Sequence, residues 1–274
     1  MYLRCGKFKL DLSHPLVMGI VNVTPDSFSD DGLYATTETA VAHGLRLIEE
    51  GAEILDIGGE STRPGSIPVS LKEELKRLLP VLEGLKHVSV PLSADTQKPE
   101  VMREALRAGA SMINDVNALA AAGALQAVAK SDAAVCLMHK QGEPLTMQLN
   151  PQYHDAVAQI KAFLGSRIEA ALAAGIARER IVIDPGFGFG KTVEHNLALL
   201  RNLEQFGELG VPLLVGLSRK SALGKIASRE IGERVYSSVA AALIAVMKGA
   251  KIVRVHDVGA TRDALAVYNA VNAE

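Results

Sequence analysis

Polar and charged side chains follow nearly every short apolar segment of the sequence. Arg254 and His256 are separated by one residue, and side chains at this spacing point the same way on an extended strand. These two basic side chains therefore suit an anionic group. The whole set combines carboxylates, amides and basic groups: Asn22, Asp56, Asp95, Asn114, Asp115, His139, Asp184, Lys220, Arg254 and His256.

The apolar segments before these residues have the length and composition of strands. Near-continuous apolar character is typical of parallel strands that helices cover on both faces. We expect eight strands, over Leu16–Val21, Ile54–Ile57, Pro91–Ala94, Ser111–Ile113, Ala133–Met138, Ile181–Ile183, Leu213–Leu217 and Ile252–Val255.

The segments between the predicted strands have helical composition. They are rich in Ala, Leu, Glu, Lys and Arg, which favour the helix. A glycine follows four of them, as is common one residue beyond the end of a helix. We expect helices over Thr37–Glu50, Leu71–Leu85, Pro99–Ala108, Tyr153–Ala174 and Val235–Lys248, with glycines at 51, 109, 175 and 249.

Eight strands alternating with helices predict an α/β fold, the (β/α)₈ or TIM barrel. Short alternating runs over residues 2–12 predict a β-hairpin that closes the bottom of the barrel. The alternative, an open doubly wound sheet, would carry G-x-G-x-x-G after its first strand, and that motif is absent. We expect a single domain over residues 1–274, because α/β barrels of this length form one domain. Active sites of such barrels lie at the C-terminal strand ends, where the polar residues are.

The composition excludes several classes of function. The net charge of −2 gives no general attraction for nucleic acid or for an anionic membrane. The longest apolar run, Val239–Met247, is too short to span a bilayer, and no signal leader is recognisable. The two cysteines, Cys5 and Cys136, are far apart and are expected to be reduced thiols. We therefore expect a cytoplasmic protein.

The strand ends also carry longer motifs, and eight of them in order are highly specific. From about residue 15 onward the chain resembles the dihydropteroate synthases. The motifs are Asn22-Val-Thr-Pro-Asp-Ser-Phe-Ser-Asp30, Asp56-Ile-Gly-Gly-Glu-Ser-Thr-Arg-Pro-Gly65, Asp95-Thr96, Ile113-Asn114-Asp115, Met138-His139, Asp184-Pro-Gly-Phe-Gly-Phe-Gly-Lys191, Gly216-Leu-Ser-Arg-Lys-Ser221 and Arg254-Val-His256-Asp257.

The resemblance implies a transferase of folate biosynthesis that joins p-aminobenzoate to a dihydropterin carrying a pyrophosphate leaving group. It also implies a pterin site. A carboxylate such as Asp184 can accept two hydrogen bonds from the amino and ring N–H groups of a pterin, and Lys220 would donate to the ring carbonyl or to the N5 region. The implied pterin-binding residues are Asp95, Asn114, Met138, Asp184, Phe189 and Lys220.

The resemblance further implies sites for the other two groups. Pyrophosphate would be bound by Asn22, Thr62, Arg63, Arg254 and His256, with Mg²⁺ on the carbonyl oxygen of Asn22. p-Aminobenzoate would lie between Phe28 and Pro64, with its carboxylate on the backbone N–H of Ser221, and sulfonamides would compete there. The catalytic set would be Asn22, Arg63, Lys220, Arg254 and His256. For Arg219, a ligand contact and a structural ion pair remain open alternatives.

The implied reaction is a substitution at the exocyclic CH₂ of the pterin, along a dissociative path. The resemblance also implies a homodimer formed through the helices around Val235–Met247. A methyltetrahydrofolate-dependent methyltransferase barrel is an alternative, but such barrels lack the Asn22–Asp30 and Ser61–Pro64 loops in this form. A catalytically silent pterin-binding protein is a second alternative, and intact catalytic residues argue against it.

Overall fold

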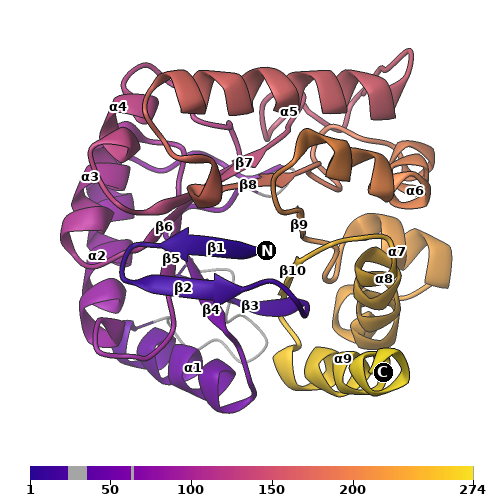
Figure 1. Ribbon diagram of the computed structural model, residues 1–274, viewed down its shortest axis with the longest axis horizontal. Helices are drawn as coiled ribbons and strands as arrows, with labels where there is room; N and C mark the ends of the chain where they lie inside the picture. The colour runs from indigo at the N-terminus through magenta and orange to yellow at the C-terminus, as the bar shows by residue number, and fades with distance from the viewer. Residues whose placement is uncertain (24–35, 63–64, 274) are drawn as a thin grey trace.

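The computed structural model describes residues 1–23, 36–62 and 65–273. Within them, eight parallel strands form a sheet ringed by helices (Figure 1). The spatial order is β8-β7-β6-β5-β4-β3-β10-β9, and a parallel bridge from Ile183 to Leu213 joins the two outer strands and closes the barrel. The strands are β3 (Leu16–Asn22), β4 (Ile54–Gly58), β5 (Leu92–Asp95), β6 (Met112–Asp115), β7 (Ala134–Met138), β8 (Ile181–Asp184), β9 (Leu214–Val215) and β10 (Ile252–Val255).

The helices begin where the sequence offers capping side chains. Thr36, Ser70 and Thr192 each accept a hydrogen bond from a backbone N–H of the first helical turn. The α-helices are α1 (Thr37–Glu49), α2 (Leu71–Leu85), α3 (Pro99–Arg107), α4 (Ala124–Ala129), α5 (Ala156–Ala173), α6 (Val193–Arg201), α7 (Ser221–Ala227), α8 (Val235–Met247) and α9 (Val258–Asn272). Short 3₁₀ helices are η2 (Arg178–Arg180), η3 (Leu203–Leu209) and η4 (Ile231–Glu233). Each described helix is too short or too polar to cross a membrane.

The predicted (β/α)₈ barrel is confirmed, and two predicted boundaries need correction. Helix α5 begins at Ala156 rather than at Tyr153, because the Asp155 side chain caps it by accepting the N–H of Ala158. Strand β9 is shorter than predicted, because its pairing stops before Gly216, a residue type that weakens strands. The glycines predicted beyond four helices all have positive φ angles, as helix-terminating glycines do.

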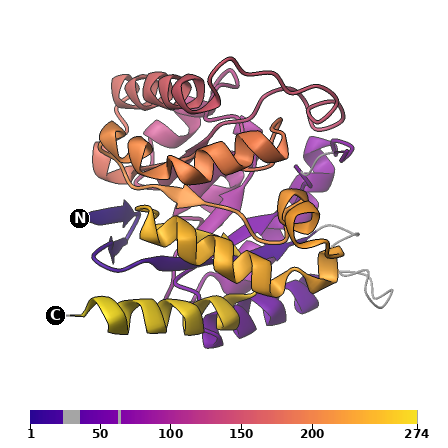
Figure 2. The same ribbon diagram turned by 90° about the vertical axis from the view of Figure 1, so that its right-hand side faces the viewer.

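The predicted hairpin is also confirmed, and it covers the N-terminal end of the barrel. Strands β1 (Tyr2–Cys5) and β2 (Phe8–Asp11) pair antiparallel, and they lie across the barrel opening in Figure 1. The hairpin and the C-terminal end of α9 lie at this same end (Figure 2). Its buried side chains share one apolar cluster with the first residues of the barrel strands: Leu3, Cys5, Leu12, Leu16, Ile54, Met112, Ala134 and Ile252. Because this cluster fills the bottom of the barrel, a ligand site belongs at the opposite end.

Candidate active site

The predicted site residues on the strands gather at the end opposite the hairpin. Asn22, Asp95, Met138 and Asp184 are the last residues of β3, β5, β7 and β8. The register of the sheet pairs Asp95 with Asn114 and Met138 with Asp184, so these side chains come from neighbouring strands. In barrels of this class, this end carries the active site.

The guanidinium of Arg254 forms ion pairs with two carboxylates at this end. Its Nε lies 2.5 Å from Oδ2 of Asp56, and its Nη2 lies 2.8 Å from Oδ2 of Asp95. Asp56 also accepts a hydrogen bond of 3.0 Å from the side-chain amide of Asn114. Arg254 was predicted to bind pyrophosphate and Asp56 had no predicted role, because pairing across strands cannot be recognised in the sequence.

Burial sets the protonation of these groups. Burial, together with the charge of Asp56, raises the pKa of Asp95 to about 7. Burial also raises the pKa of Asp184, although the N–H of Gly186 opposes the shift. Burial alone would lower the pKa of Arg254, but Asp56 and Asp95 outweigh it and hold that pKa above its usual value. The guanidinium therefore stays charged.

Two carboxylate oxygens at this site have no hydrogen-bond donor within the described ranges. They are Oδ1 of Asp56 and Oδ1 of Asp95, and both are buried. A buried acceptor without a donor costs free energy. A ligand that brings N–H groups would remove this cost, so the site suits a nitrogen-rich heterocycle.

The glycine-rich segment after β8 packs closely against the chain that follows β7. Gly186 and Gly190 have positive φ angles of 71° and 64°. A Cβ at Gly186 would come within 1.9 Å of the carbonyl oxygen of His139, and a Cβ at Gly190 within 2.2 Å of that of Gln141. Only glycine fits at these two positions. At both positions the close neighbour is the protein's own backbone.

Phe189 and Lys220 lie against each other at the same end of the barrel. The Nζ of Lys220 is 4.1 Å from the centroid of the Phe189 ring, a cation–π contact. Both residues were predicted to bind the same ring, and the structure brings them together. Phe189 belongs to a small buried apolar group with Val116, Met138 and Met147.

A buried lysine without a predicted role, Lys191, holds this region together. The side chain of Lys191 donates to the carbonyl oxygens of Gly186 and Phe189, at 2.8 and 3.0 Å. Its Nζ is also 3.1 Å from Nδ1 of His139. Burial and the charge of Lys191 lower the pKa of His139 to about 3, so that imidazole is neutral and accepts the bond.

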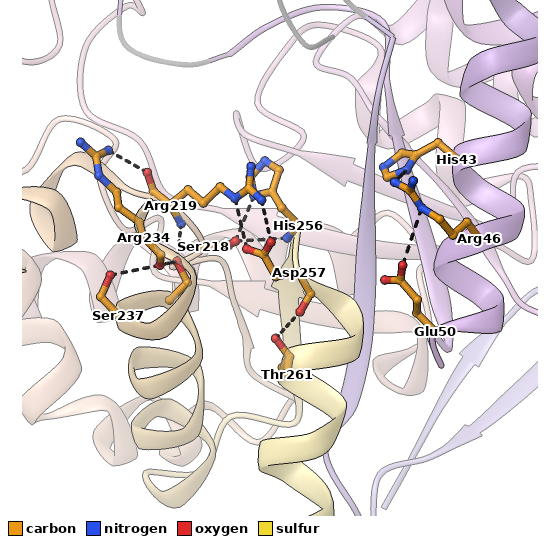
Figure 3. Close-up of polar contacts among 11 residues, drawn as sticks. His43, Arg46, Glu50, Ser218, Arg219, Arg234, Ser237, His256, Asp257 and Thr261 are labelled. Carbon is orange, nitrogen blue, oxygen red and sulfur yellow. Dashed lines mark hydrogen bonds and ion pairs between the residues drawn. The ribbon is translucent and has the colours of Figure 1, made fainter. Parts of the chain in front are cut away.

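His256 and Arg219 are held by different partners at the ends of β9 and β10 (Figure 3). The Oγ of Ser218 is 3.0 Å from Nδ1 of His256 and accepts the backbone N–H of His256 at 3.1 Å. Arg219 forms a two-pronged ion pair with Asp257, with distances of 2.6 and 3.1 Å. Of the two alternatives left open for Arg219, the structural ion pair is confirmed.

A second buried cluster stands at the base of the loop after β4. The Nζ of Lys98 is 2.8 Å from Oε1 of Glu60 and 2.5 Å from Oε2 of Glu74. Glu60 also accepts the backbone N–H of Val69 at 2.8 Å, which ties the two ends of the loop together. Thr96 donates to Glu74 at 2.5 Å. This cluster could not be found from the sequence, because its members are spread over residues 60–98.

The remaining predicted residues are placed as follows. Phe28, Arg63 and Pro64 lie outside the described residues. Thr62 is partly buried, two residues beyond Glu60. Ser221 is the first residue of α7, as predicted.

The fold and this arrangement define a (β/α)₈-barrel enzyme. Its C-terminal strand ends present the carboxylates of Asp56 and Asp95, the amide of Asn114 and the cations of Lys220 and Arg254, which can bind a heterocycle and an anion side by side.

The chain matches known proteins along almost its whole length. Residues 18–256 match the family described as pterin binding enzyme. The dihydropteroate synthase of Escherichia coli strain K12 is 50% identical over 262 residues, which cover 95% of this chain and 93% of that protein. The chain belongs to the pterin binding enzyme family, among the dihydropteroate synthases.

Solved structures agree with this assignment. Xanthomonas albilineans dihydropteroate synthase with 4-aminobenzoic acid is 56% identical, with a TM-score of 0.94 over 100% of this chain and 98% of that one. Yersinia pestis dihydropteroate synthase in a sulfonamide drug complex is 48% identical, with a TM-score of 0.96 over 100% of both chains.

Proposed function

We propose that this protein condenses 6-hydroxymethyl-7,8-dihydropterin pyrophosphate with p-aminobenzoate to give 7,8-dihydropteroate and pyrophosphate. The observation that carries the proposal is the set of buried acceptors at the strand ends beside the contact of Lys220 with Phe189. This set matches a pterin, which has donors along one edge and acceptors on the pyrazine side. One domain, residues 1–274, would carry the whole reaction.

The pterin would bind with its amino and ring N–H groups on Asp184. That carboxylate keeps one hydrogen bond, from the N–H of Gly186 at 2.7 Å to Oδ1, and carboxylates accept several such bonds. Asp95 and Asn114, from neighbouring strands, would contact other ring positions. Met138 and Phe189 would pack against the ring, and Lys220 would donate to it.

The two carboxylates that pair with Arg254 can stabilise a positive charge on the pterin ring. When Asp95 is ionised, Asp56 and Asp95 together exceed the charge of Arg254 by one unit. A local negative charge of this kind stabilises the cation that forms when the C–O bond to pyrophosphate breaks. This supports a dissociative path, in which the C–N bond to the amine forms afterwards. The aniline nitrogen loses its proton after it attacks, so no general base is needed beforehand.

The pyrophosphate would lie near His256 and Asn22, with Thr62, Arg63 and Arg254 as further donors. His256 is oriented by Ser218, so its other ring nitrogen can donate to an oxygen of the leaving group. Arg254 already binds two carboxylates, so we assign it to the border between the ring and the pyrophosphate. Donors that meet developing charge contribute about 10²- to 10³-fold each to a rate.

Asn22 fits a role as a Mg²⁺ ligand. Its Oδ1 lies 3.8 Å from the point where a Cβ of Gly58 would stand, so glycine leaves the space beside it open. Within the described residues there is no group of three or more His, Cys, Asp or Glu that could hold a metal. Mg²⁺ needs few protein ligands, because it keeps several waters and binds phosphate oxygens. When bound, it would help to neutralise the pyrophosphate.

The p-aminobenzoate ring would lie between Phe28 and Pro64, with its carboxylate at the N–H of Ser221. The complexes of relatives with 4-aminobenzoic acid and with a sulfonamide drug support this assignment. We therefore propose that sulfonamides bind here in competition with p-aminobenzoate.

The protein is proposed to act as a cytoplasmic homodimer through α8. This helix leaves large apolar side chains exposed: Tyr236, Ile244 and Met247 are 88%, 44% and 67% accessible. An apolar face of this kind is commonly covered in an oligomer. Sedimentation of the wild type and of Tyr236→Glu tests the assignment, with a dimer expected for the first and a monomer for the second.

The deciding experiment measures pyrophosphate release from the pterin pyrophosphate with Mg²⁺, with and without p-aminobenzoate. We expect release and dihydropteroate formation that depend on p-aminobenzoate in the wild type. His256→Ala is expected to be slower, and His87→Ala, at an exposed histidine away from the site, to be unchanged. Tight pterin binding without turnover would instead support the silent binder, and methyl transfer to a corrinoid would support the methyltransferase.

A further inference from the structure

Lys191 is a buried cation without a role in the reaction proposed above. Its side chain is almost fully buried, with 3% of the residue exposed. An ammonium has three N–H donors, and four acceptors lie within hydrogen-bond distance of it: the carbonyl oxygens of Gly186, Phe189 and His139, and Nδ1 of His139. The carbonyl oxygen of His139 is the most distant of them, at 3.5 Å. A buried charge is costly unless its hydrogen bonds are made. Here every donor of the ammonium has an acceptor within reach.

These contacts join two segments at the mouth of the barrel. His139 follows β7, whereas Gly186 and Phe189 belong to the turn after β8. The same turn is held from outside by two weaker contacts. Tyr153 donates to the carbonyl oxygen of Gly190 at 3.0 Å, and Asn196 accepts the N–H of Gly188 at 2.8 Å. Lys191 is therefore the charged centre of the contacts that fix this turn.

Gly186 and Phe189, whose carbonyl oxygens bind Lys191 at 2.8 and 3.0 Å, each also contact a proposed pterin-binding side chain. The N–H of Gly186 donates to Oδ1 of Asp184 at 2.7 Å. The ring of Phe189 lies 4.1 Å from Nζ of Lys220. The residues Gly186 and Phe189 therefore connect the Lys191 ammonium with Asp184 and with Lys220.

We propose that Lys191 is a positioning residue for the pterin, acting through Gly186 and Phe189 to hold Asp184 and Lys220 in register with the ring. The inference rests on the proposed function, since it assumes a pterin between these two side chains. Lys191 itself would not touch the ligand.

The charged and titratable groups around Lys191 determine when it carries its proton. Burial and the charge of Lys220 lower the pKa of Lys191, while Asp184 raises it, and the result is about 7. His139 is neutral, and burial raises the pKa of Tyr153 to about 12, so neither supplies charge. The ring of His195 lies beyond Tyr153, at 4.9 Å from it. A neutral amine has only two N–H donors for these acceptors, so pterin affinity should fall above neutral pH.

The test measures the affinity for 6-hydroxymethyl-7,8-dihydropterin by calorimetry, together with thermal stability. Lys191→Met removes the donors and keeps the length of the side chain. The matched control is Arg180→Met, because Arg180 is also a buried cation that donates to carbonyl oxygens, those of Ala133 and Val128. Arg180 lies before β8, at the opposite end of the barrel.

We expect Lys191→Met to weaken pterin binding roughly 10- to 100-fold, the effect of losing bonds from a charged group. Arg180→Met should lower stability and leave the affinity within about twofold. The double variant Lys191→Met/Phe189→Leu should lose less pterin affinity than the product of the two single fold-losses. The reason is that both substitutions disturb the same turn after β8. The difference in pterin affinity between Lys191→Met and the wild type should become smaller as the pH rises from 6 to 8.5. Over this range the ammonium of Lys191 in the wild type loses its proton.

Three outcomes would overturn the inference: unchanged pterin affinity in Lys191→Met, equal losses in both variants, or independent effects in the double variant. If Lys191→Met does not fold, Lys191→Gln replaces it in the comparison with Arg180→Met. This variant keeps two N–H donors but carries no charge. A wild type that fails to bind the pterin would instead contradict the proposed function.

Discussion

Arg254 and Asp56 form an ion pair across a strand, with 2.5 Å between Nε and Oδ2, although β3 lies between β10 and β4 in the sheet. Asp56 is fully buried and also accepts the amide of Asn114. One carboxylate thus sets the position of two side chains that come from other strands. Asp56 therefore positions Arg254 and Asn114 in addition to contributing its own charge to the site.

Asp56→Asn is therefore expected to lower kcat/KM for the pterin pyrophosphate roughly 10- to 100-fold. The reason is that a charge-assisted bond contributes about 1.5–3 kcal/mol, and losing it frees Arg254 to adopt other positions. Steady-state kinetics with p-aminobenzoate at saturation measure the effect. Glu53→Gln is the control, because Glu53 pairs with Arg262 at 2.9 Å before β4, at the other end of that strand. A loss of equal size in both variants would contradict a local role for Asp56.

Stability should depend on pH through Asp95. Its pKa is raised to about 7 by burial and by Asp56, whereas an unfolded aspartate titrates near about 3.9. Between these values the folded protein binds more protons, so the free energy of unfolding falls as the pH rises from about 4 to about 7. Asn does not titrate, so Asp95→Asn should reduce this fall.

Urea unfolding at pH 5 and pH 8 measures the difference for the wild type and for Asp95→Asn. Asp132→Asn is the control, since its side chain is 73% exposed and should keep the pH dependence of the wild type. If Asp95→Asn keeps that dependence too, other groups dominate the titration. Burial also raises the pKa of Asp115, to about 6, so the effect of Asp95 should be partial.

The sequence predicted the barrel well because its signals are local. Apolar runs, capping side chains and helix-ending glycines each act within a few residues, and the strand ends follow from them. Asp95, Asn114 and Asp184 could therefore be placed at one mouth before their contacts were known. The ligands of the site could be predicted only from the resemblance to a family.

The partners of the charged residues could not be predicted in the same way. Arg254 and Asp56 are 198 residues apart along the chain. The periodicity of apolar residues carries no information on a pair so far apart in sequence. Lys191 was predicted only as the end of a glycine-rich motif, and its acceptors depend on how that turn folds onto His139. These contacts follow from tertiary packing.

Glu60→Gln should raise the KM for p-aminobenzoate about tenfold and leave pterin affinity unchanged. Glu60 ties the two ends of the loop after β4 by binding Lys98 and the N–H of Val69. Pro64, one of the proposed contacts of p-aminobenzoate, belongs to that loop. The amide can still accept from Val69, but it loses the ion pair, worth about 1.5–3 kcal/mol. Glu100→Gln is the control, because Glu100 pairs with Arg103 at the exposed surface of α3, outside that loop. An unchanged KM would show that Lys98 and Glu74 suffice.

Ser218→Ala is expected to reduce kcat about tenfold by releasing His256. The hydroxyl contacts both Nδ1 and the backbone N–H of His256. A hydroxyl that donates to Nδ1 leaves the ring proton on Nε2, where it can meet an oxygen of the departing pyrophosphate. Without it, the ring samples both tautomers and other orientations.

Rapid-quench measurement of pyrophosphate release separates this chemical step from product release. The control is Ser237→Ala on α8, visible beside the same network in Figure 3, whose hydroxyl donates to the carbonyl oxygen of Arg234, the residue before that helix. If His256 acts on the leaving group, Ser218→Ala should slow release while the KM for p-aminobenzoate stays constant, and it should add little to His256→Ala. Additive losses in the double variant would mean that Ser218 supports the site by a route other than His256.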